Sequence, residues 1–473
     1  MDTHTENNLK MQKTSKIAKF ANGFEKIVPD SLTVAFILLV IVGVLAVIFA
    51  GAPVFVSTET HKSVADSMAG SFWNLLTFSM QMCLVSILGN VFAMSPPIRR
   101  GLKRICRIPR TTVGAYVLCA AVGFVLSFFH WAIGMMGSIV IGKEMLVVAR
   151  DKGIKIHVPS FVACLFSVSL VGWSGIAASP VLYASTEGYL KTLVDPATAA
   201  TMKDMYTIQE TVLYAKPMIT LILSGIVCFV AVLILRPRKQ EDIEEITQEQ
   251  YEYYSSNVTL AGTKPRTFAE RMKNSIVLQY IIVVLMAYTC VKQLVTNGIV
   301  GLSLDSYNYI ILCATLACCM RPRIFTSLVV DTVSSVWGFI IQYPIYAAIF
   351  GIITGTGLDK IIAELFLSIA STKTWPTIAM IYSGFMNIFV PSGGSKFIIE
   401  APYIIPVSQT LNVPIETIIM SYSYGDCGTN MLTPFWWIVP CSMFKLDLHK
   451  VYPYAVVAAI ATIIFYAVAL FFW

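Results

Sequence analysis

Charged side chains are scarce in this chain of 473 residues. Asp, Glu, Lys and Arg together make up only 13% of it, whereas 56% of the residues are hydrophobic. A typical soluble domain has about 25% charged residues. The composition therefore argues against a soluble all-helical protein and favours a protein that lies in a membrane.

Motifs of several enzyme and ATPase classes are also missing. The chain has no P-loop motif for phosphate binding, which argues against ATP-driven transport, and no HExxH zinc motif. None of its 11 cysteines forms a CxxC pair, and most lie in apolar runs, where cysteine behaves as a small buried hydrophobe. Only five histidines are present, which gives little support for a catalytic site. We therefore expect no enzyme activity and no bound cofactor.

Long apolar runs dominate what is present. Runs of about 20 residues recur from residue 32 to the last residue, and such a run can cross a bilayer as a helix. The first run is too long for the core of a signal peptide, so we expect it to span the membrane. The sequence predicts an all-α polytopic membrane protein with about nine spanning helices, at residues 32–50, 71–94, 160–185, 216–236, 275–293, 308–320, 325–350, 415–442 and 452–473.

Two further apolar stretches, 113–150 and 375–411, are too long for a single crossing. Each is interrupted in its middle by a polar, Gly-rich segment. In the second stretch, Pro391 cannot continue a helix, and Gly393 and Gly394 allow a tight turn. We interpret both stretches as re-entrant hairpins that enter and leave on one face of the membrane.

Two of the expected spanning helices are broken as well. Residues 173–180, which include Ser174 and Ser179, interrupt helix 160–185. Residues 425–434, with a Gly-Asp, a Thr-Asn and a Pro, interrupt helix 415–442. In a bilayer each unpaired peptide group costs several kcal/mol, so spanning helices are normally continuous. Breaks at matching places in two halves are typical of secondary carriers, which bind substrate near the membrane midplane.

The distribution of basic residues predicts the orientation. Of the 34 Lys and Arg residues, 26 fall in segments on one side of the expected helices and six on the other. The positive-inside rule then places the N-terminus in the cytoplasm of a multi-pass protein of the inner (plasma) membrane. We divide the chain into a cytoplasmic N-terminal segment 1–31, a first half 32–236, a charged cytoplasmic linker 237–273 and a second half 274–473. The net charge of +7 does not indicate a nucleic-acid partner, because the basic residues flank the apolar runs.

The two halves share one order of elements. A spanning helix, a hairpin, a broken helix and a second spanning helix occur at 71–236 and again at 325–473, in opposite directions. This order predicts inverted repeats related by a pseudo-two-fold axis in the membrane plane. Chance similarity remains the alternative, since Gly is frequent in all membrane helices.

Four segments resemble a known family. Residues 338–347, 389–396 and 424–436 are similar to the signatures of the bacterial short-chain fatty acid transporter family (AtoE-type), and residues 173–180 are similar to its first-half break. The resemblance covers the chain from about residue 20 to 470. It implies a member of the wider ion-transporter superfamily of carboxylate carriers with paired hairpins. The expected function is secondary active transport of small monocarboxylates, such as acetoacetate or butyrate, by alternating access.

The candidate substrate and ion contacts lie at the breaks. They are Ser392, Gly393, Gly394, Ser395, Lys396, Asp426, Thr429, Asn430, His130, Ser174, Ser179 and Gln342. Hydroxyls, amides and unwound carbonyls suit both a carboxylate and a sodium ion. We expect Na⁺ or H⁺ as the coupling ion, with Na⁺ at the hairpin tips and no ligand set assigned.

Two of these residues depart from the family pattern. Lys396 stands where Gln is usual, and His130 stands where Asn is usual. A lysine at the midplane costs at least a few kcal/mol, so we expect it to pair with Asp426, Glu400 or the substrate. The alternatives are a structural ion pair for Lys396 and a hydrogen-bonded packing role for His130.

Other functions remain open at this point. A related carrier for dicarboxylates, amino acids or peptides has similar sequence features, and an anion channel is the alternative from another class. The expected partners are a small carboxylate and the lipid bilayer, and a homodimer is compatible with the sequence.

Overall fold

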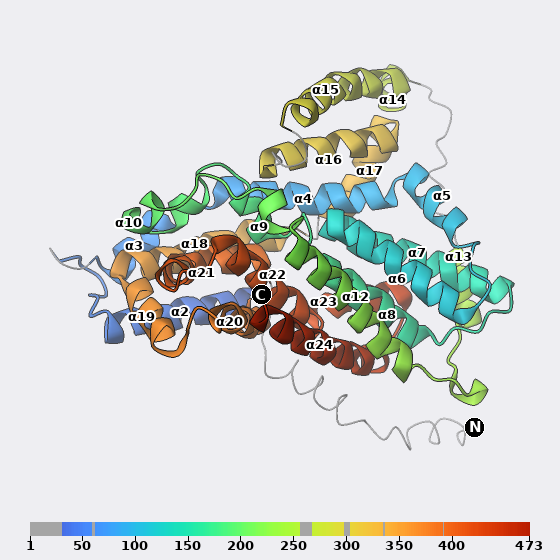
Figure 1. Cartoon of the computed structure of the whole chain (residues 1–473). Helices are drawn as coiled ribbons and strands as arrows, with labels where there is room; N and C mark the ends of the chain where they lie inside the picture. Colours follow the sequence, from blue (N-terminus) through green and yellow to red (C-terminus); the bar gives the residue numbers. More distant parts are fainter. Residues whose placement is uncertain (1–30, 59–61, 256–266, 298–302, 334–335, 391) are drawn as a thin grey trace, which may run out of the picture.

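The computed structural model describes residues 31–58, 62–255, 267–297, 303–333, 336–390 and 392–473. Within these ranges all regular elements are helices, as the sequence predicts (Figure 1). The expected N-terminal segment 1–31 lies outside the described residues except for Ser31, and so does Pro391 at the second hairpin tip.

The helices follow in chain order. They are α2 (Ser31–Phe49), α3 (Val64–Ser71), α4 (Leu76–Met94), α5 (Pro96–Ile105), α6 (Thr112–Phe129), α7 (Trp131–Asp151), α8 (Val158–Gly172), α9 (Ser179–Ala184), η2 (Leu190–Leu193), α10 (Pro196–Ala200), α11 (Ile208–Thr211), α12 (Ala215–Leu235), η3 (Gln240–Asp242), α13 (Gln248–Ser255), α14 (Phe268–Lys273), α15 (Ile276–Asn297), α16 (Leu304–Cys319), α17 (Pro322–Val333), α18 (Trp337–Thr356), α19 (Leu358–Ile369), α20 (Trp375–Phe389), α21 (Gly393–Thr410), α22 (Ile415–Asn430), α23 (Phe435–Phe444) and α24 (Leu448–Phe471).

Six described helices are long and apolar enough to cross a membrane: α2, α6, α7, α12, α15 and α24. The number rises to nine if each of three bent pairs counts as one span. These pairs are α4 with α5, bent by 58°, α16 with α17, bent by 120°, and α18 with α19, bent by 79°. The expected number of about nine equals the upper end of this range, but the members differ. Helices α6 and α7, which the sequence analysis assigned to one re-entrant hairpin, are each long enough to cross, and the expected broken helices 160–185 and 415–442 are not in this count.

All four breaks predicted from the sequence are present. The two hairpins are interrupted between α6 and α7 and between α20 and α21, and the two discontinuous helices between α8 and α9 and between α22 and α23. Local chemistry explains the first hairpin tip. The His130 backbone is extended, and its Nδ1 atom accepts from the N–H groups of Ala132, at 3.2 Å, and Ile133, which caps α7.

One expected helix is wrong. The stretch 325–350 is not a single span, because α17 ends at Val333 and α18 begins at Trp337. Asp331 and Thr332 lie in the last turn of α17, and two serines follow Val333 in the sequence; all four are weak helix formers. The left-handed backbone of Met320 ends α16, and α17 turns back from it by 120°. The break matters for function because it brings Asp331 and Trp337 to the central cavity.

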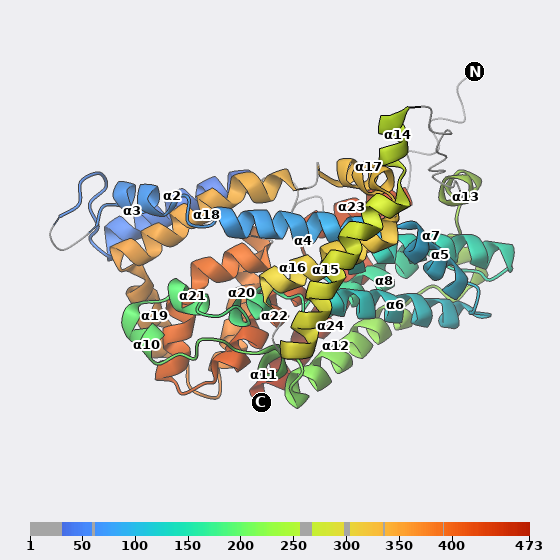
Figure 2. The same ribbon diagram turned by 90° about the horizontal axis from the view of Figure 1, so that it is seen from above.

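The same helix pairings recur in the two halves. Helix α6 packs on α8 as α20 packs on α22, α4 packs on α7 as α18 packs on α21, and α8 packs on α12 as α22 packs on α24. The two sets meet where α12 lies along α24 and where α4 lies along α18 (Figures 1 and 2). The helix breaks of both halves therefore come together in the middle of the molecule.

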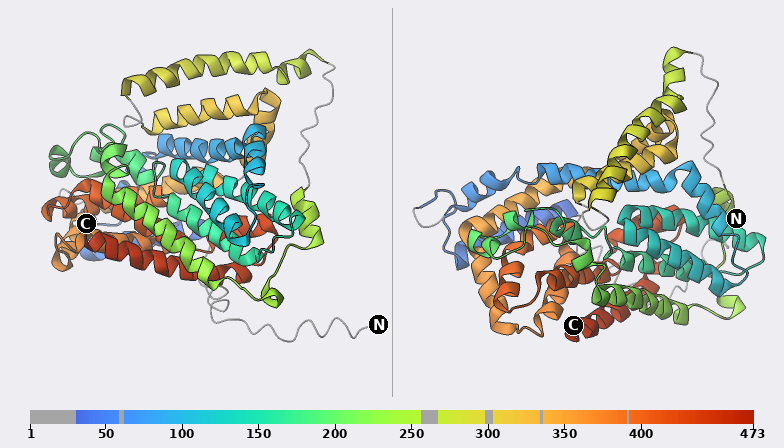
Figure 3. Two further views of the ribbon diagram at one scale, coloured as in Figure 1. Left: turned by 45° about the vertical axis from the view of Figure 1, so that its right-hand side comes forward. Right: turned by 45° about the horizontal axis from the view of Figure 1, so that its top comes forward.

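Two peripheral parts complete the fold. Within the linker 237–273, helix α13 packs on α7, and the Tyr254 hydroxyl donates to the Phe444 carbonyl at 2.5 Å. Helix α15 contacts α16 and stands away from the rest of the chain (Figure 3). Its outer face is apolar, with Val277 and Tyr288 each 71% exposed, as suits a helix in lipid.

Candidate functional site

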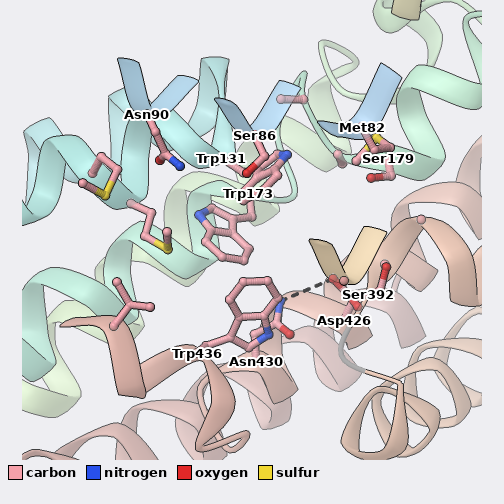
Figure 4. A pocket seen from close by; sticks show the side chains of 18 of the residues that line it. Met82, Ser86, Asn90, Trp131, Trp173, Ser179, Ser392, Asp426, Asn430 and Trp436 are labelled. Carbon is pink, nitrogen blue, oxygen red and sulfur yellow. Dashed lines mark hydrogen bonds between the residues drawn. The ribbon is translucent and has the colours of Figure 1, made fainter. Parts of the chain in front are cut away.

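A cavity of about 580 Å³ lies where the breaks of the two halves meet. This volume is typical of small-molecule sites. Helices α4, α7, α17, α18, α22 and α23 contribute to its wall, together with the starts of α9 and α21 (Figure 4). The residues that line it are Met82, Ser86, Asn90, Met94, Trp131, Met135, Met136, Trp173, Ala177, Ala178, Ser179, Pro180, Asp331, Thr332, Trp337, Gly338, Gln342, Tyr343, Tyr346, Ser392, Gly393, Gly394, Ser423, Asp426, Cys427, Asn430, Trp436, Val439 and Met443.

One side of the cavity is aromatic. Trp131 at the first hairpin tip and Trp173 at the α8–α9 break lie edge to face, with ring centroids 5.6 Å apart. Trp173 meets Trp436 of the second half in the same way, at 4.8 Å. Figure 4 shows these three indoles together, opposite Ser392 and Asp426. Such a wall offers apolar surface with a few indole N–H donors.

The other side is polar and is built around the start of α21. Ser392 has an extended backbone and is the N-cap residue of α21, but its side chain makes no capping hydrogen bond. Gly393 and Gly394, the first two residues of the helix, line the cavity. The first N–H groups of a helix lack partners within it and attract negative charge. This end of α21 is therefore suited to an anion.

Asp426 already lies at this position. One of its carboxylate oxygens, Oδ1, is 3.3 Å from the Lys396 ammonium. The other, Oδ2, accepts a weak hydrogen bond of 3.4 Å from the Asn430 amide, drawn as a dashed line in Figure 4. A Cβ atom at Gly393 would be only 2.8 Å from Oδ2, so glycine is required for this approach. The Asp426 carboxylate is thus held between an ammonium and the beginning of a helix.

Lys396 lies behind the cavity and does not line it. Its side chain is 1% exposed, and the ammonium donates to the Ser383 carbonyl at 2.6 Å and to the Ser383 hydroxyl at 2.9 Å. The ammonium also lies over the Tyr422 ring, 4.6 Å from its centroid. Its ion-pair partner Asp426 lines the cavity, so Lys396 affects the cavity through this pair.

The sequence analysis missed a residue that organises this wall. Asn387, on α20, donates from Nδ2 to the Asn430 side-chain oxygen at 2.7 Å, to the Thr429 hydroxyl at 3.0 Å and to the Asp426 carbonyl at 3.1 Å. These contacts connect the second hairpin to the α22 break. The available signal was an amide near the end of an apolar helical arm, where polar residues are rare and costly.

Seven of the twelve candidate residues line the cavity: Ser179, Gln342, Ser392, Gly393, Gly394, Asp426 and Asn430. The other five pack behind it. Ser395 and Lys396 are buried within α21, and the Thr429 hydroxyl donates to the Gly425 carbonyl at 2.8 Å.

In the first half, two candidate residues have local structural contacts. The Ser174 hydroxyl donates to the Val171 carbonyl at 2.9 Å. His130 caps α7 and stacks on Tyr307 with ring centroids 5.4 Å apart. Within the described part of the chain, His130 therefore caps a helix and packs on a neighbouring ring. Its expected role at the site stays a prediction.

A bundle of helices with paired breaks around a central cavity defines a membrane transporter. The solved YdaH transporter of Alcanivorax borkumensis shares this fold, with a TM-score of 0.59 over 94% of this chain and 98% of that chain, at 14% sequence identity. The pattern of the short chain fatty acid transporter family matches residues 12–473, and the chain belongs to that family.

Two curated relatives agree with this assignment. One from Haemophilus influenzae is 26% identical over 465 residues, which cover 97% of this chain and 99% of the relative. One from Escherichia coli is 24% identical over 459 residues, which cover 96% and 99% of the two chains. Both are described as candidate short-chain fatty acid transporters. The resemblance found in the sequence is confirmed, and the chain is a multi-pass membrane transporter of this family rather than an enzyme.

Proposed function

We propose that the protein is a secondary active transporter that carries short-chain monocarboxylates, such as acetoacetate or butyrate, by alternating access. The observation that carries this proposal is the two-sided cavity. Its indole wall suits a short apolar tail, and the start of α21 on the opposite wall suits one carboxylate.

The polar groups on the α21 side determine how the carboxylate docks. The Ser392 hydroxyl, the Asn430 amide and the first N–H groups of α21 all belong to this wall. Half-helix starts that point at an anionic substrate group are a recurring feature of carriers. In this pose the alkyl tail extends toward Trp173 and Trp436.

The cavity favours one carboxylate over two. No Lys or Arg is present among the described residues that line it. A second carboxylate, at the far end of a dicarboxylate, would meet the indole wall, where a desolvated charge is costly. This observation supports a monocarboxylate over the dicarboxylate alternative.

Alternating access follows from the proposed inverted repeats and the proposed orientation. The recurring helix pairings support the repeats. With the N-terminus in the cytoplasm, the cavity extends to the inner ends of α4 and α23 at Met94 and Met443, which corresponds to an inward-facing state. Beyond the tip, α21 packs on α9 so closely that a Cβ atom at Gly394 would be 2.4 Å from the Tyr183 hydroxyl. This contact favours a carrier over an open anion channel.

Transport by the purified protein in liposomes tests the proposal. Vesicles preloaded with unlabelled butyrate should accumulate external radiolabelled butyrate by counterflow, which a channel does not support. Ser392→Ala and Asn430→Ala should abolish saturable uptake, because each removes a hydrogen-bonding group from the carboxylate wall. Ser368→Ala, at an exposed hydroxyl of α19, is the control and should transport as the wild type does. Normal transport by both wall variants would show that the site lies elsewhere.

A further inference from the structure

A second buried carboxyl group lies next to the site without a role so far. Glu400 is on α21, one helical turn after Lys396, and it is 0% exposed. Neither of its carboxyl oxygens makes a hydrogen bond of normal geometry to any described residue. It does not line the cavity. A glutamate with this burial and no ion pair to a described cation is uncommon, because burying a charge is costly unless it is paired.

Its titratable and charged neighbours come from three helices. Lys396 and Tyr403 are on the same helix, Tyr422 and Asp426 are on α22, and Tyr382 is on α20. The hydroxyls of Tyr382 and Tyr403 lie 2.9 Å apart and bond to each other. The Tyr422 hydroxyl lies near the Glu400 carboxyl without a normal hydrogen bond to it or to another described residue. Lys396 is therefore the only cation among these neighbours.

The charges of Lys396, Asp426 and Glu400 balance only when one of the two acids carries a proton. Lys396 and Asp426 form an ion pair with no net charge. If Glu400 were ionised as well, two carboxylates would share a single ammonium in a buried site. The surplus negative charge would be poorly solvated, and it would repel an anion at the start of α21. If Glu400 carries a proton, the three groups together are neutral.

We propose that Glu400 is a proton-binding site whose proton is linked to the binding of the substrate carboxylate. This inference rests on the proposed function and deepens it by assigning H⁺ as the coupling ion. The protonated site is neutral and accepts an anion, whereas the deprotonated site has a charge of −1 and rejects it. Carboxylate binding therefore favours proton binding, and proton binding favours carboxylate binding by the same factor.

We place the entry of the proton at Asp426. Asp426 lines the cavity with 14% of its side chain exposed, and its Oδ1 atom faces the Lys396 ammonium. In the proposed sequence Asp426 takes a proton from water, and this proton is then passed on to Glu400. Asp426 returns to a carboxylate, Lys396 keeps its charge, and Glu400 ends as a neutral acid.

The first experiment compares wild type, Glu400→Gln and Glu364→Gln in liposomes. Wild-type uptake of labelled butyrate should be stimulated several-fold by an inward proton gradient, and its counterflow should decline as the pH rises equally on both sides. Glu400→Gln removes the proton site, so its remaining counterflow should not vary with pH and its uptake should ignore the gradient. Glu364→Gln changes an exposed glutamate of α19 and should respond to pH as the wild type does.

A second measurement needs no transport. Infrared difference spectroscopy of the purified wild type at neutral pH should show the C=O band of a protonated carboxylic acid. This band should be missing from Glu400→Gln and present in Glu364→Gln. An unchanged band in Glu400→Gln would overturn the assignment, even if that variant is inactive.

The outcomes separate this inference from the proposed function. Absence of butyrate counterflow by the wild type would contradict the proposed function, while the infrared band would still test Glu400. Normal counterflow with no response to a proton gradient would leave the carrier intact and overturn proton coupling. A pH response in Glu400→Gln equal to that of the wild type would also overturn it.

Discussion

Trp173 and Trp436 lie edge to face with ring centroids 4.8 Å apart, although they are 263 residues apart in the chain. Trp173 follows the end of α8, and Trp436 is near the start of α23. The contact therefore joins the broken helix of one half to the broken helix of the other. Because both rings line the cavity, this pair determines how much room is left for the substrate tail.

Trp436→Ala should change the preferred chain length of the substrate. Removing the indole enlarges the apolar side of the cavity, and each additional buried methylene group contributes about 0.8 kcal/mol, roughly a fourfold change in affinity. Unlabelled carboxylates of increasing length, competing with labelled butyrate, should show a shift of the optimum to longer acids. Trp73→Ala, at an indole that is 63% exposed, is the control. An unchanged chain-length profile in Trp436→Ala would contradict this placement of the tail.

Asn387→Ala should weaken substrate binding, although Asn387 itself is not among the residues proposed to contact the substrate. The change removes the amide that holds Asn430, Thr429 and the Asp426 carbonyl, and it leaves buried acceptors without a donor. Such a loss costs about 1–3 kcal/mol, so the KM for butyrate should rise by roughly 5- to 150-fold. Initial rates over a range of butyrate concentrations measure the effect. An unaltered KM in correctly folded protein would mean that Asn430 does not depend on Asn387.

Gly394→Ala should block transport by preventing close contact between the halves. The new Cβ atom would lie 2.4 Å from the hydroxyl of Tyr183, a ring that is only 1% exposed and has little room to move. Gly101→Ala is a matched helical control, because apart from its chain neighbours and its own helix backbone no atom lies within 4 Å of the added Cβ. We expect uptake to be lost in the first variant and retained in the second, with both proteins inserted. Normal uptake by Gly394→Ala would show that α21 and α9 tolerate a wider separation.

Lys396→Gln should create a need for another cation. Without the ammonium, Asp426 and Glu400 are left as buried acids with no positive partner among their described neighbours. We expect uptake to fall and to be restored in part by sodium, whereas the wild type should depend less on sodium. The measurement is initial uptake against external sodium, from zero to saturation, at two pH values. A wild type that is inactive without sodium, and a variant with the same sodium curve, would make Lys396 purely structural.

Cysteine labelling should verify the proposed orientation. Ala200 in α10 and Ser255 at the end of α13 are both exposed, so a cysteine at either position can be reached by a probe. In a background without native cysteines, an impermeant reagent should label Ala200→Cys in intact cells and Ser255→Cys only after permeabilisation. Labelling of Ser255→Cys in intact cells would invalidate the inverted arrangement.

Much of the fold could be predicted because its signals are local. A polar or Gly-rich interruption in an apolar run is visible without knowing any neighbour, so the breaks in both expected hairpins and both expected discontinuous helices were located correctly. The stretch 325–350 failed for the opposite reason. Its average hydrophobicity is that of a span, and the break after Val333 depends on a few weak helix formers and on how α17 packs against α4 and α16.

The sequence by itself determined the membrane class, the family and the breaks that surround the cavity. Only the tertiary structure decided which polar residues face that cavity. Helix α21 is buried on almost every side, so no apolar stripe indicates its orientation, and Lys396 turns toward Ser383 while Ser392 lines the cavity. The indole wall brings together residues from distant parts of the chain. Such contacts depend on how separate helices pack, and the pattern within a single helix does not contain that information.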